Sequence, residues 1–273
     1  MNFIHDLPSY IDPILLEIGE FELRWYSLSY LFAFGVFAGL IFWRINRGEN
    51  FFIRDKKKAK DEFLNIFLAA IAGLILGARL GYGLFYEIDL LIHPQKLFNP
   101  FQSGEFIGIY GMSFYGGLFG SFLGVYFLCY LKKINFWNWL NFSAPAVGLA
   151  YFFGRLGNFL NGELYGRETD LPWGMYFPKD PQYLLRHPSQ LYEAFFEGLV
   201  IFLILWPLRN NKKMKNKLFG SFLIMYGIFR FLIEFFREER FYGIFTTGQY
   251  LSLTVIVAGI ILVVRKIKHP DIV

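Results

Sequence analysis

The sequence predicts an all-α polytopic integral membrane protein with about seven transmembrane helices, its N-terminus outside and its C-terminus in the cytoplasm. Three observations lead to this fold class. Charged side chains make up only 18% of the 273 residues, against about 25% in an ordinary soluble domain. Seven apolar stretches approach the roughly 20 residues that a helix needs to cross a bilayer. Basic residues gather in alternate loops. We expect one transmembrane domain over residues 1–273.

An arm of about 25 residues precedes the first apolar stretch. It carries five acidic side chains, and its first basic residue is Arg24, so it lacks the basic start of a cleavable signal peptide. Its mixture of apolar and charged residues is consistent with a segment that lies at the outer membrane interface or packs on the protein. We therefore expect the stretch over 26–43 to be the first span and the insertion signal.

The other spans follow from apolar length, and their ends are approximate. They lie at 63–85, 109–131, 137–161, 189–206, 218–236 and 247–264. The span at 63–85 is clear, because residues 63–77 contain one polar side chain, Asn65, where a soluble helix would have a polar face. The spans at 109–131 and 137–161 are less regular because Gly, Asn and Pro145 interrupt them.

Small residues predict how two of these helices pack. Glycine recurs every four residues on the spans at 63–85 and 109–131, at Gly73, Gly77, Gly81, Gly116, Gly120 and Gly124. Such faces let helix backbones approach closely, so we interpret them as packing surfaces. The longest segment between spans, residues 162–188, is expected to be an outward-facing loop.

Basic residues predict the orientation of the spans. Seventeen Lys and Arg residues fall on one side, at positions 44, 47, 54, 56, 57, 58, 60, 132, 133, 209, 212, 213, 215, 217, 265, 266 and 268. Seven fall on the other side, at positions 24, 96, 167, 179, 186, 237 and 240. Since the richer side faces the cytoplasm, the N-terminus lies outside. The net charge of +5 is then a result of topology, and we expect no nucleic-acid partner.

Arg79, Arg155, Arg230 and Glu234 fall inside the apolar stretches, where an ionised group is costly unless it is paired or hydrated. Each arginine lies six residues from the outer end of its span, which is roughly 9 Å below the outer surface. The topology therefore predicts one layer of guanidinium groups. Glu234, four residues after Arg230, could hold that arginine as a structural partner or take part in catalysis.

Further polar residues fall at the same predicted depth. Tyr26 opens the first span, Tyr115 lies near the outer start of the third, and Asn158 and Glu163 follow Arg155. Together these residues predict a cationic pocket beneath the outer surface, suited to an anionic headgroup that guanidinium groups bind bidentately. Arg79 could belong to this pocket or serve a structural role.

Other classes of site have weaker support. The single cysteine, Cys129, lies near the cytoplasmic end of its span, which argues against a protein nucleophile at the arginine layer. The histidines, His5, His93, His187 and His269, lack metal-ligand spacing, so we expect no metal and no organic cofactor. A transporter for an anionic solute and a non-catalytic lipid-binding scaffold are the alternatives. Charges at one depth, without paired broken spans, argue against the transporter.

A fourteen-residue motif gives the sequence a specific resemblance. Residues 154–167 read GRLGNFLNGELYGR, which resembles the signature of the prolipoprotein diacylglyceryl transferase family. The resemblance continues in order along the chain at 25–26, 77–82, 111–118, 186–193, 226–230 and 234–237. It therefore covers essentially the whole chain.

The resemblance implies a reaction, its partners and a location. Members transfer the diacylglyceryl group of phosphatidylglycerol to the lipobox cysteine thiol of a preprolipoprotein signal peptide, and release glycerol 1-phosphate. They are seven-span proteins of the bacterial inner (cytoplasmic) membrane, and their active site faces the periplasmic leaflet.

The resemblance also implies roles for individual residues. Arg155 and Arg230 correspond to positions implicated in headgroup binding and catalysis. Positions important for activity correspond to Tyr26, Asn158, Glu163, Gly166 and Glu234. In mechanistic terms, we expect the arginines to stabilise charge on the leaving phosphate, Asn158 to orient an oxygen, and the two glutamates to hold the arginines.

One position departs from the family pattern. Better-known members have a histidine where this chain has Tyr115, and that histidine is a candidate base. Because a tyrosine hydroxyl ionises only far above neutral pH, it is a poor general base. We expect Tyr115 to position the headgroup or the thiol by hydrogen bonding. Proton removal then falls to a carboxylate, to His187 or to the lipid phosphate.

Overall fold

The structure is a computed structural model of the chain. It describes residues 3–19, 21–49, 53, 55–93, 95, 97, 99, 101–102, 105–106, 111–238 and 241–265. The chain divides into two compact units. The first comprises Met1–Arg47 and Leu140–Asp271, and the second comprises Gly48–Trp139. Each unit is described separately below.

The first unit is a helical bundle. Its helices are α1 (Trp25–Asn46), most of α5 (Phe136–Leu160), α6 (Ser189–Tyr192), η3 (Glu193–Val200), α7 (Ile201–Leu208), α8 (Leu218–Ile233), η4 (Glu234–Phe236) and α9 (Thr247–Val264). The elements α6, η3 and α7 form one continuous helix, of which η3 is a π-helical segment. Such segments are rare and occur frequently at functional sites.

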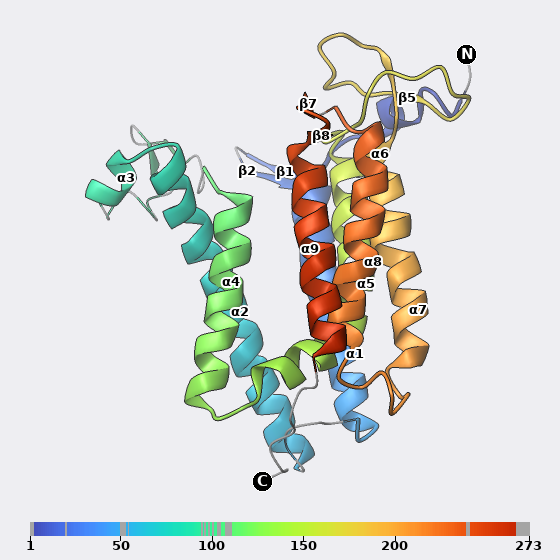
Figure 1. Cartoon of the computed structure of the whole chain (residues 1–273). Helices are drawn as coiled ribbons and strands as arrows, with labels where there is room; N and C mark the ends of the chain where they lie inside the picture. Colours follow the sequence, from blue (N-terminus) through green and yellow to red (C-terminus); the bar gives the residue numbers. More distant parts are fainter. Residues whose placement is uncertain are drawn as a thin grey trace. The chain divides into compact units, whose positions relative to one another are not determined.

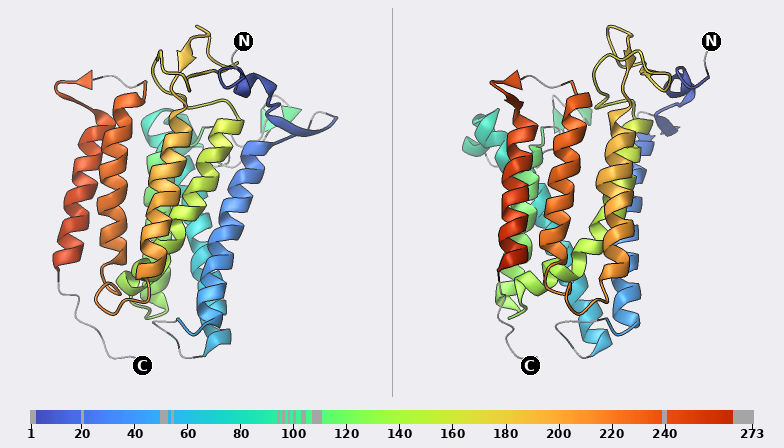
Figure 2. Two further views of the ribbon diagram at one scale, coloured as in Figure 1. Left: turned by 90° about the vertical axis from the view of Figure 1, so that its right-hand side faces the viewer. Right: turned by 45° about the vertical axis from the view of Figure 1, so that its right-hand side comes forward.

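Helix α5 lies between α1 and α7 in this bundle (Figure 2). It packs on α1, where the rings of Phe32 and Phe153 meet edge to face at 4.7 Å. It packs on the η3–α7 helix at Gly148, where a Cβ atom would lie only 2.8 Å from the carbonyl oxygen of Gly198. Helix α8 packs on η3, α7 and α9. The arginine-bearing helices α5 and α8 therefore flank the same π-helical segment.

The second unit is built on two antiparallel helices, α2 (Lys56–Phe85) and α4 (Phe114–Leu131). It also contains α3 (Asp89–Ile92) and the strands β3 (Phe101–Gln102) and β4 (Glu105–Phe106). The predicted glycine faces meet, because a Cβ atom on Gly77 would lie 2.7 Å from the Cα atom of Gly120. Glycine is thus required on both helices, and the predicted packing surface is confirmed.

Short hairpins lie at one end of the first unit (Figure 1). They pair β1 (Ile14–Ile18) with β2 (Phe21–Arg24), β5 (Met175–Tyr176) with β6 (Leu185–Arg186), and β7 (Phe241–Tyr242) with β8 (Phe245–Thr246). The 3-10 helix η1 (Leu7–Tyr10) precedes the first hairpin. These strands were not predicted from the sequence, because most span only two residues and are too short to show an alternation of apolar and polar residues.

Each of the seven predicted spans contains a helix, although the third helix begins at Phe114, later than expected. The last, 247–264, is confirmed at both ends, and the second begins earlier than expected, at Lys56. Within the described residues, six helices are long and apolar enough to cross a membrane. The seventh, α5, has 25 residues but carries three Asn side chains, Ser143 and Arg155.

A few predictions fall outside the described residues. They concern the proposed start of the third span at positions 109 and 110, and His269. They also concern the basic residues at positions 54, 96, 240, 266 and 268.

Candidate active site

A buried carboxylate organises the interior of the first unit. Glu193, the first residue of η3, has no exposed surface. Its Oε1 atom lies 2.7 Å from Nη1 of Arg230 on α8 and 2.6 Å from Nη1 of Arg237. Its Oε2 atom lies 2.9 Å from Nε of Arg155 on α5. The structure therefore brings Arg155 and Arg230 together, and Glu193 is the group that joins them.

Glu234 holds Arg230 from the other side. Nη2 of Arg230 lies 2.9 Å from Oε2 of Glu234, four residues later in the chain. Oε1 of the same carboxylate accepts a hydrogen bond from the hydroxyl of Thr246 at 2.9 Å, and Thr246 is the N-cap residue of α9. The carboxylate of Glu234 therefore contacts the N-terminus of α9.

A glycine makes this arrangement possible. A Cβ atom on Gly248, in the first turn of α9, would overlap the carboxyl group of Glu234. The absence of a side chain at this position lets the carboxylate lie directly against the start of the helix.

Arg155 belongs to a chain of polar contacts that leads to Glu163. Nη1 of Arg155 faces Oδ1 of Asn158 at 3.4 Å, and Nδ2 of Asn158 donates to Oε1 of Glu163 at 2.8 Å. The second carboxylate oxygen of Glu163 accepts from Nδ2 of Asn161 at 2.7 Å. We expected Glu163 to hold an arginine directly. Instead its carboxylate holds two amides, one of which orients Arg155, because Glu163 lies beyond the end of α5.

Tyr26 lies in the first turn of α1, in the same unit. Its hydroxyl is 3.5 Å from that of Tyr30. A Cβ atom on Gly157 of α5 would meet the side chain of Ser29 at 2.7 Å and the carbonyl oxygen of Tyr26 at 3.7 Å, so close helix packing brings α1 toward α5. A role for Tyr26 beside Arg155 and Glu163 stays a prediction.

Gly166 and His187 connect the 162–188 loop to the segment after α8. The amide of Gly166 donates to the carbonyl of His187 at 2.8 Å. A Cβ atom on Gly166 would overlap the carbonyl oxygen of Phe236, so glycine is required here. The ring of His187 is buried, with Nδ1 3.1 Å from the hydroxyl of Tyr192. Burial lowers the pKa of His187, which keeps its ring neutral at pH 7.

Two predicted site residues, Arg79 and Tyr115, belong to the second unit. Arg79 is buried, and its guanidinium donates to the backbone carbonyls of Leu97 and Gly111. These bonds hold the segment between α2 and α4. Tyr115 lies in the first turn of α4 and is 60% exposed. Their membership of the arginine layer stays a prediction.

The arginines of the first unit are paired with a carboxylate, Glu193, that the sequence did not predict as their partner. Arg155, Arg230 and Arg237 are offset by Glu193 and Glu234. Uncompensated charges would be too costly in a bundle interior, where the dielectric constant is low. The sequence did not lead us to predict a site role for Glu193, Glu197, Tyr151 or Arg237. Glu193 and Glu197, two carboxylates four residues apart inside the predicted 189–206 span, could have indicated a buried polar site.

The arginine cluster nevertheless keeps donors for a ligand. The side chains of Arg155, Arg230 and Arg237 are 17%, 16% and 14% exposed. Within the described part of the chain, Nη2 of Arg155 and Nε of Arg230 have no protein acceptor. Two guanidinium groups from different helices thus offer N–H groups beside one carboxylate, an arrangement that suits a phosphate.

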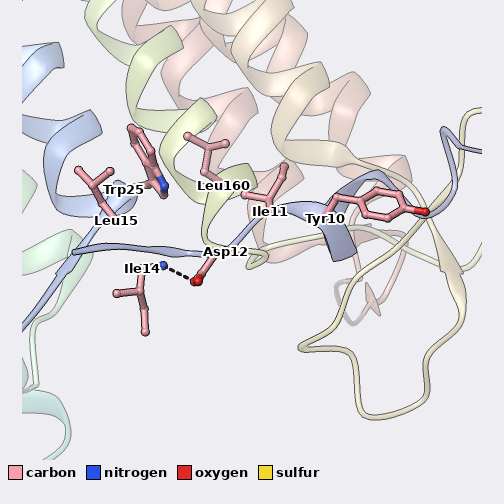
Figure 3. Close-up of a pocket in the computed structure, with 7 residues that line it drawn as sticks. All are labelled: Tyr10, Ile11, Asp12, Ile14, Leu15, Trp25 and Leu160. Carbon is pink, nitrogen blue, oxygen red and sulfur yellow. Dashed lines mark hydrogen bonds between the residues drawn. The ribbon is translucent and has the colours of Figure 1, made fainter. Parts of the chain in front are cut away.

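A separate hollow of 440 Å³ lies where the N-terminal arm meets the ends of α1 and α5 (Figure 3). It is lined by Tyr10, Ile11, Asp12, Ile14, Leu15, Trp25 and Leu160. Asp12, the one charged residue of this lining, accepts a hydrogen bond from the amide of Ile14 at 2.9 Å. Across the described residues, no three His, Cys, Asp or Glu side chains gather to hold a metal ion.

Comparison with known proteins identifies the family. A sequence model of the family described as prolipoprotein diacylglyceryl transferase matches residues 13–265. Three relatives carry the name phosphatidylglycerol–prolipoprotein diacylglyceryl transferase. The protein of Campylobacter hominis is 39% identical, over 99% of this chain and 96% of the relative. That of Chlorobaculum tepidum is 42% identical, over 97% and 94%. That of Geobacter sulfurreducens is 41% identical, over 99% and 100%. The chain therefore belongs to the prolipoprotein diacylglyceryl transferase family.

Proposed function

We propose that this chain transfers the diacylglyceryl group of phosphatidylglycerol to the lipobox cysteine thiol of a preprolipoprotein, forming a thioether and releasing glycerol 1-phosphate. Family membership and similarity over nearly the full chain to transferases of this name support the reaction. The observation that carries the site assignment is the convergence of Arg155 and Arg230 on Glu193, with N–H groups left for a ligand.

The arginines act on the leaving group in this reaction. The thiol loses its proton, and the sulfur attacks the sp3 glycerol carbon that bears the phosphate. A sulfur–carbon bond forms, the carbon–oxygen bond breaks, and the electron pair leaves on the phosphate oxygen. Donors already aimed at this developing charge stabilise it, and loss of one such donor typically costs about 3 kcal/mol. Nearby guanidinium groups also favour the thiolate over the thiol.

The surrounding residues keep these donors in place. Glu193 and Glu234 fix Arg230 from two sides, while Asn158, held by Glu163, contacts Arg155. Gly166 permits the close approach of the 162–188 loop to the segment that contains Arg237. For Tyr115 we propose a positioning role toward the headgroup or thiol, and for Arg79 a role in holding the segment between α2 and α4.

We further propose that seven helices cross the bacterial inner membrane, with the N-terminus outside and the site toward the periplasmic leaflet. In the first unit, Arg44 and Arg47 end α1, and the basic segment 209–217 joins α7 to α8 at that same end. In the second unit, the basic start of α2 and Lys132 lie together, because Lys132 pairs with Glu62 at 3.2 Å. Both patterns support a cytoplasmic location for these ends.

Purified protein incubated with phosphatidylglycerol vesicles and a synthetic lipobox peptide tests this function. We expect a peptide mass increased by one diacylglyceryl group, together with free glycerol phosphate. A peptide with Ser in place of its cysteine is the control and should remain unmodified. Lipid binding without product would favour the scaffold alternative, and uptake of an anionic solute into proteoliposomes without product would favour the transporter.

A further inference from the structure

A second polar chain leads away from Arg155, on the side opposite Asn158. The Nε–H group of Arg155 donates to the hydroxyl oxygen of Tyr151 at 2.8 Å, one turn earlier on α5. The hydroxyl of Tyr151 in turn donates to Oε2 of Glu197 in η3. The guanidinium carbon of Arg155 also lies 4.9 Å from the centre of the Tyr151 ring. One tyrosine therefore fixes Arg155 by a hydrogen bond and by ring contact.

Burial of the Glu197 carboxyl group inside the bundle costs folding free energy. Glu197 has no exposed surface, and among the described residues its Oε1 atom has no hydrogen-bond partner. A buried carboxyl group with one oxygen unsatisfied costs stability. Packing in the bundle does not require it, because an apolar side chain of similar size would fill the space without this penalty. The carboxyl group does contact the hydroxyl of Tyr151, which links it to Arg155 and indicates a role in the site.

The π-helical segment places Glu197 where this role is possible. Glu193 and Glu197 both belong to η3. Glu193 contacts Arg155 directly at 2.9 Å, and Glu197 is connected to it through Tyr151. The segment η3 thus holds the guanidinium group by two different contacts. The N–H groups of Arg155 that face Tyr151 and Asn158 are occupied, which leaves Nη2 for the substrate.

We propose that Tyr151 and Glu197 form a positioning pair for Arg155, which they orient so that Nη2 meets the phosphate of the lipid substrate. This inference rests on the proposed function. Neither residue touches the reacting atoms. Their contribution is to hold the donor in the geometry of the transition state before the substrate arrives, as supporting groups do around preorganised sites.

Steady-state kinetics of three variants in phosphatidylglycerol vesicles tests the pair. Tyr151→Phe removes the hydroxyl that joins Arg155 to Glu197. We expect kcat to fall about 10- to 100-fold, with KM for the lipid within about threefold, because Arg230 still binds the phosphate. Tm should also fall, since Glu197 then loses its partner. Tyr250→Phe is the matched control, because the Tyr250 hydroxyl donates a hydrogen bond to the carbonyl of Tyr242 and not to a residue of the arginine cluster. This variant should leave kcat and KM unchanged.

The double variant Tyr151→Phe, Glu197→Leu separates positioning from stability. This variant no longer buries a carboxyl group that lacks a hydrogen-bond partner, so Tm should return toward the wild-type value while kcat stays low. Recovery of kcat together with Tm would overturn the proposal, as would wild-type kcat in Tyr151→Phe.

Two further outcomes keep the test decisive. Should the double variant fail to fold, Glu197→Gln, which keeps an acceptor for Tyr151, decides the matter. A kcat within about threefold of wild type would support the pair, and a tenfold loss would overturn it. Absence of thioether with the wild-type protein would instead overturn the proposed function, and this inference with it.

Discussion

Arg230 and Glu193 form a buried ion pair of 2.7 Å between α8 and the π-helical segment η3. Glu193 has no exposed surface and also contacts Arg155 and Arg237. The carboxylate of Glu193, shared by three guanidinium groups, offsets part of their positive charge and does not occupy all of their N–H donors. The arginines can therefore stay ionised inside a helical bundle and still bind a phosphate.

Replacement of Glu193 by Gln should disable the site. The variant leaves Arg155, Arg230 and Arg237 without their shared counter-charge, and breaking a buried pair typically costs about 3–5 kcal/mol. We expect a clear fall in Tm and a loss of thioether formation of at least about 100-fold. Glu17→Gln, on the exposed face of β1, is the control and should behave as wild type. Normal turnover in Glu193→Gln would exclude a role for the shared carboxylate.

Replacement of Arg155 by Lys should reduce activity although it keeps the charge. Lysine has no Nε–H group for Tyr151 and no planar pair of donors for the phosphate. We expect kcat to fall about 100-fold, a loss of roughly 2.7 kcal/mol of transition-state stabilisation. Arg24→Lys, whose exposed side chain pairs with Glu22, is the matched control. Near-normal thioether formation by Arg155→Lys would argue against bidentate recognition.

The sequence predicted the helices better than their lengths. Apolar length gave all seven, but α2 extends back to Lys56 because Asp55 caps it by accepting a hydrogen bond from the amide of Lys58. Hydropathy does not predict helical turns made of charged residues, such as the first turns of α2, because they lie outside the apolar stretch. The meeting of Arg155 and Arg230 followed from equal depth on two spans that run in the same direction, which is a geometric consequence of topology.

The arrangement within the site was less accessible to sequence reasoning. Depth places residues in a layer but does not say which helices are neighbours, so Glu193 could not be assigned as the common partner of the arginines. A π-helical segment changes which residues share a face, and no periodicity in the sequence revealed η3. Arg237 follows η4, outside the helices to which a depth argument applies.

Substitution of Gly120 by Ala should destabilise the second unit. Alanine in a helix normally stabilises by about 1 kcal/mol relative to glycine. At Gly120, however, the added methyl group would overlap the backbone of Gly73 and Gly77 on α2, and α4 must then move away. We expect a lower Tm, with a cost of about 1–3 kcal/mol. Gly39→Ala on α1, where a Cβ atom has open space, should leave Tm unchanged or raise it.

Acid should loosen the 162–188 loop through Asp180. Two hydrogen bonds from the Arg186 guanidinium, at 2.7 and 3.1 Å, lower the pKa of Asp180. A carboxyl group with a lowered pKa in the folded state stabilises the fold above its ordinary pKa of about 4. This stabilisation is lost as the pH falls from there through the folded-state pKa.

Limited proteolysis of the loop between pH 3 and pH 7 measures this effect. The wild-type loop should be protected at neutral pH and become cleavable in acid. Asp180→Asn should be cleavable throughout, with a flatter pH profile. A wild-type profile in Asp180→Asn would show that this ion pair does not hold the loop.

The central claim is that Arg155 and Arg230 together grip the phosphate of the lipid. Solid-state NMR of protein labelled with 15N in its arginine guanidinium groups, reconstituted with phosphatidylglycerol, measures their proximity to the phosphorus atom through the 15N–31P dipolar coupling. We predict dephasing of the bound-lipid 31P signal that weakens in Arg155→Lys and, separately, in Arg230→Lys. Dephasing that is absent in the wild-type protein, or unchanged in both variants, would contradict the account.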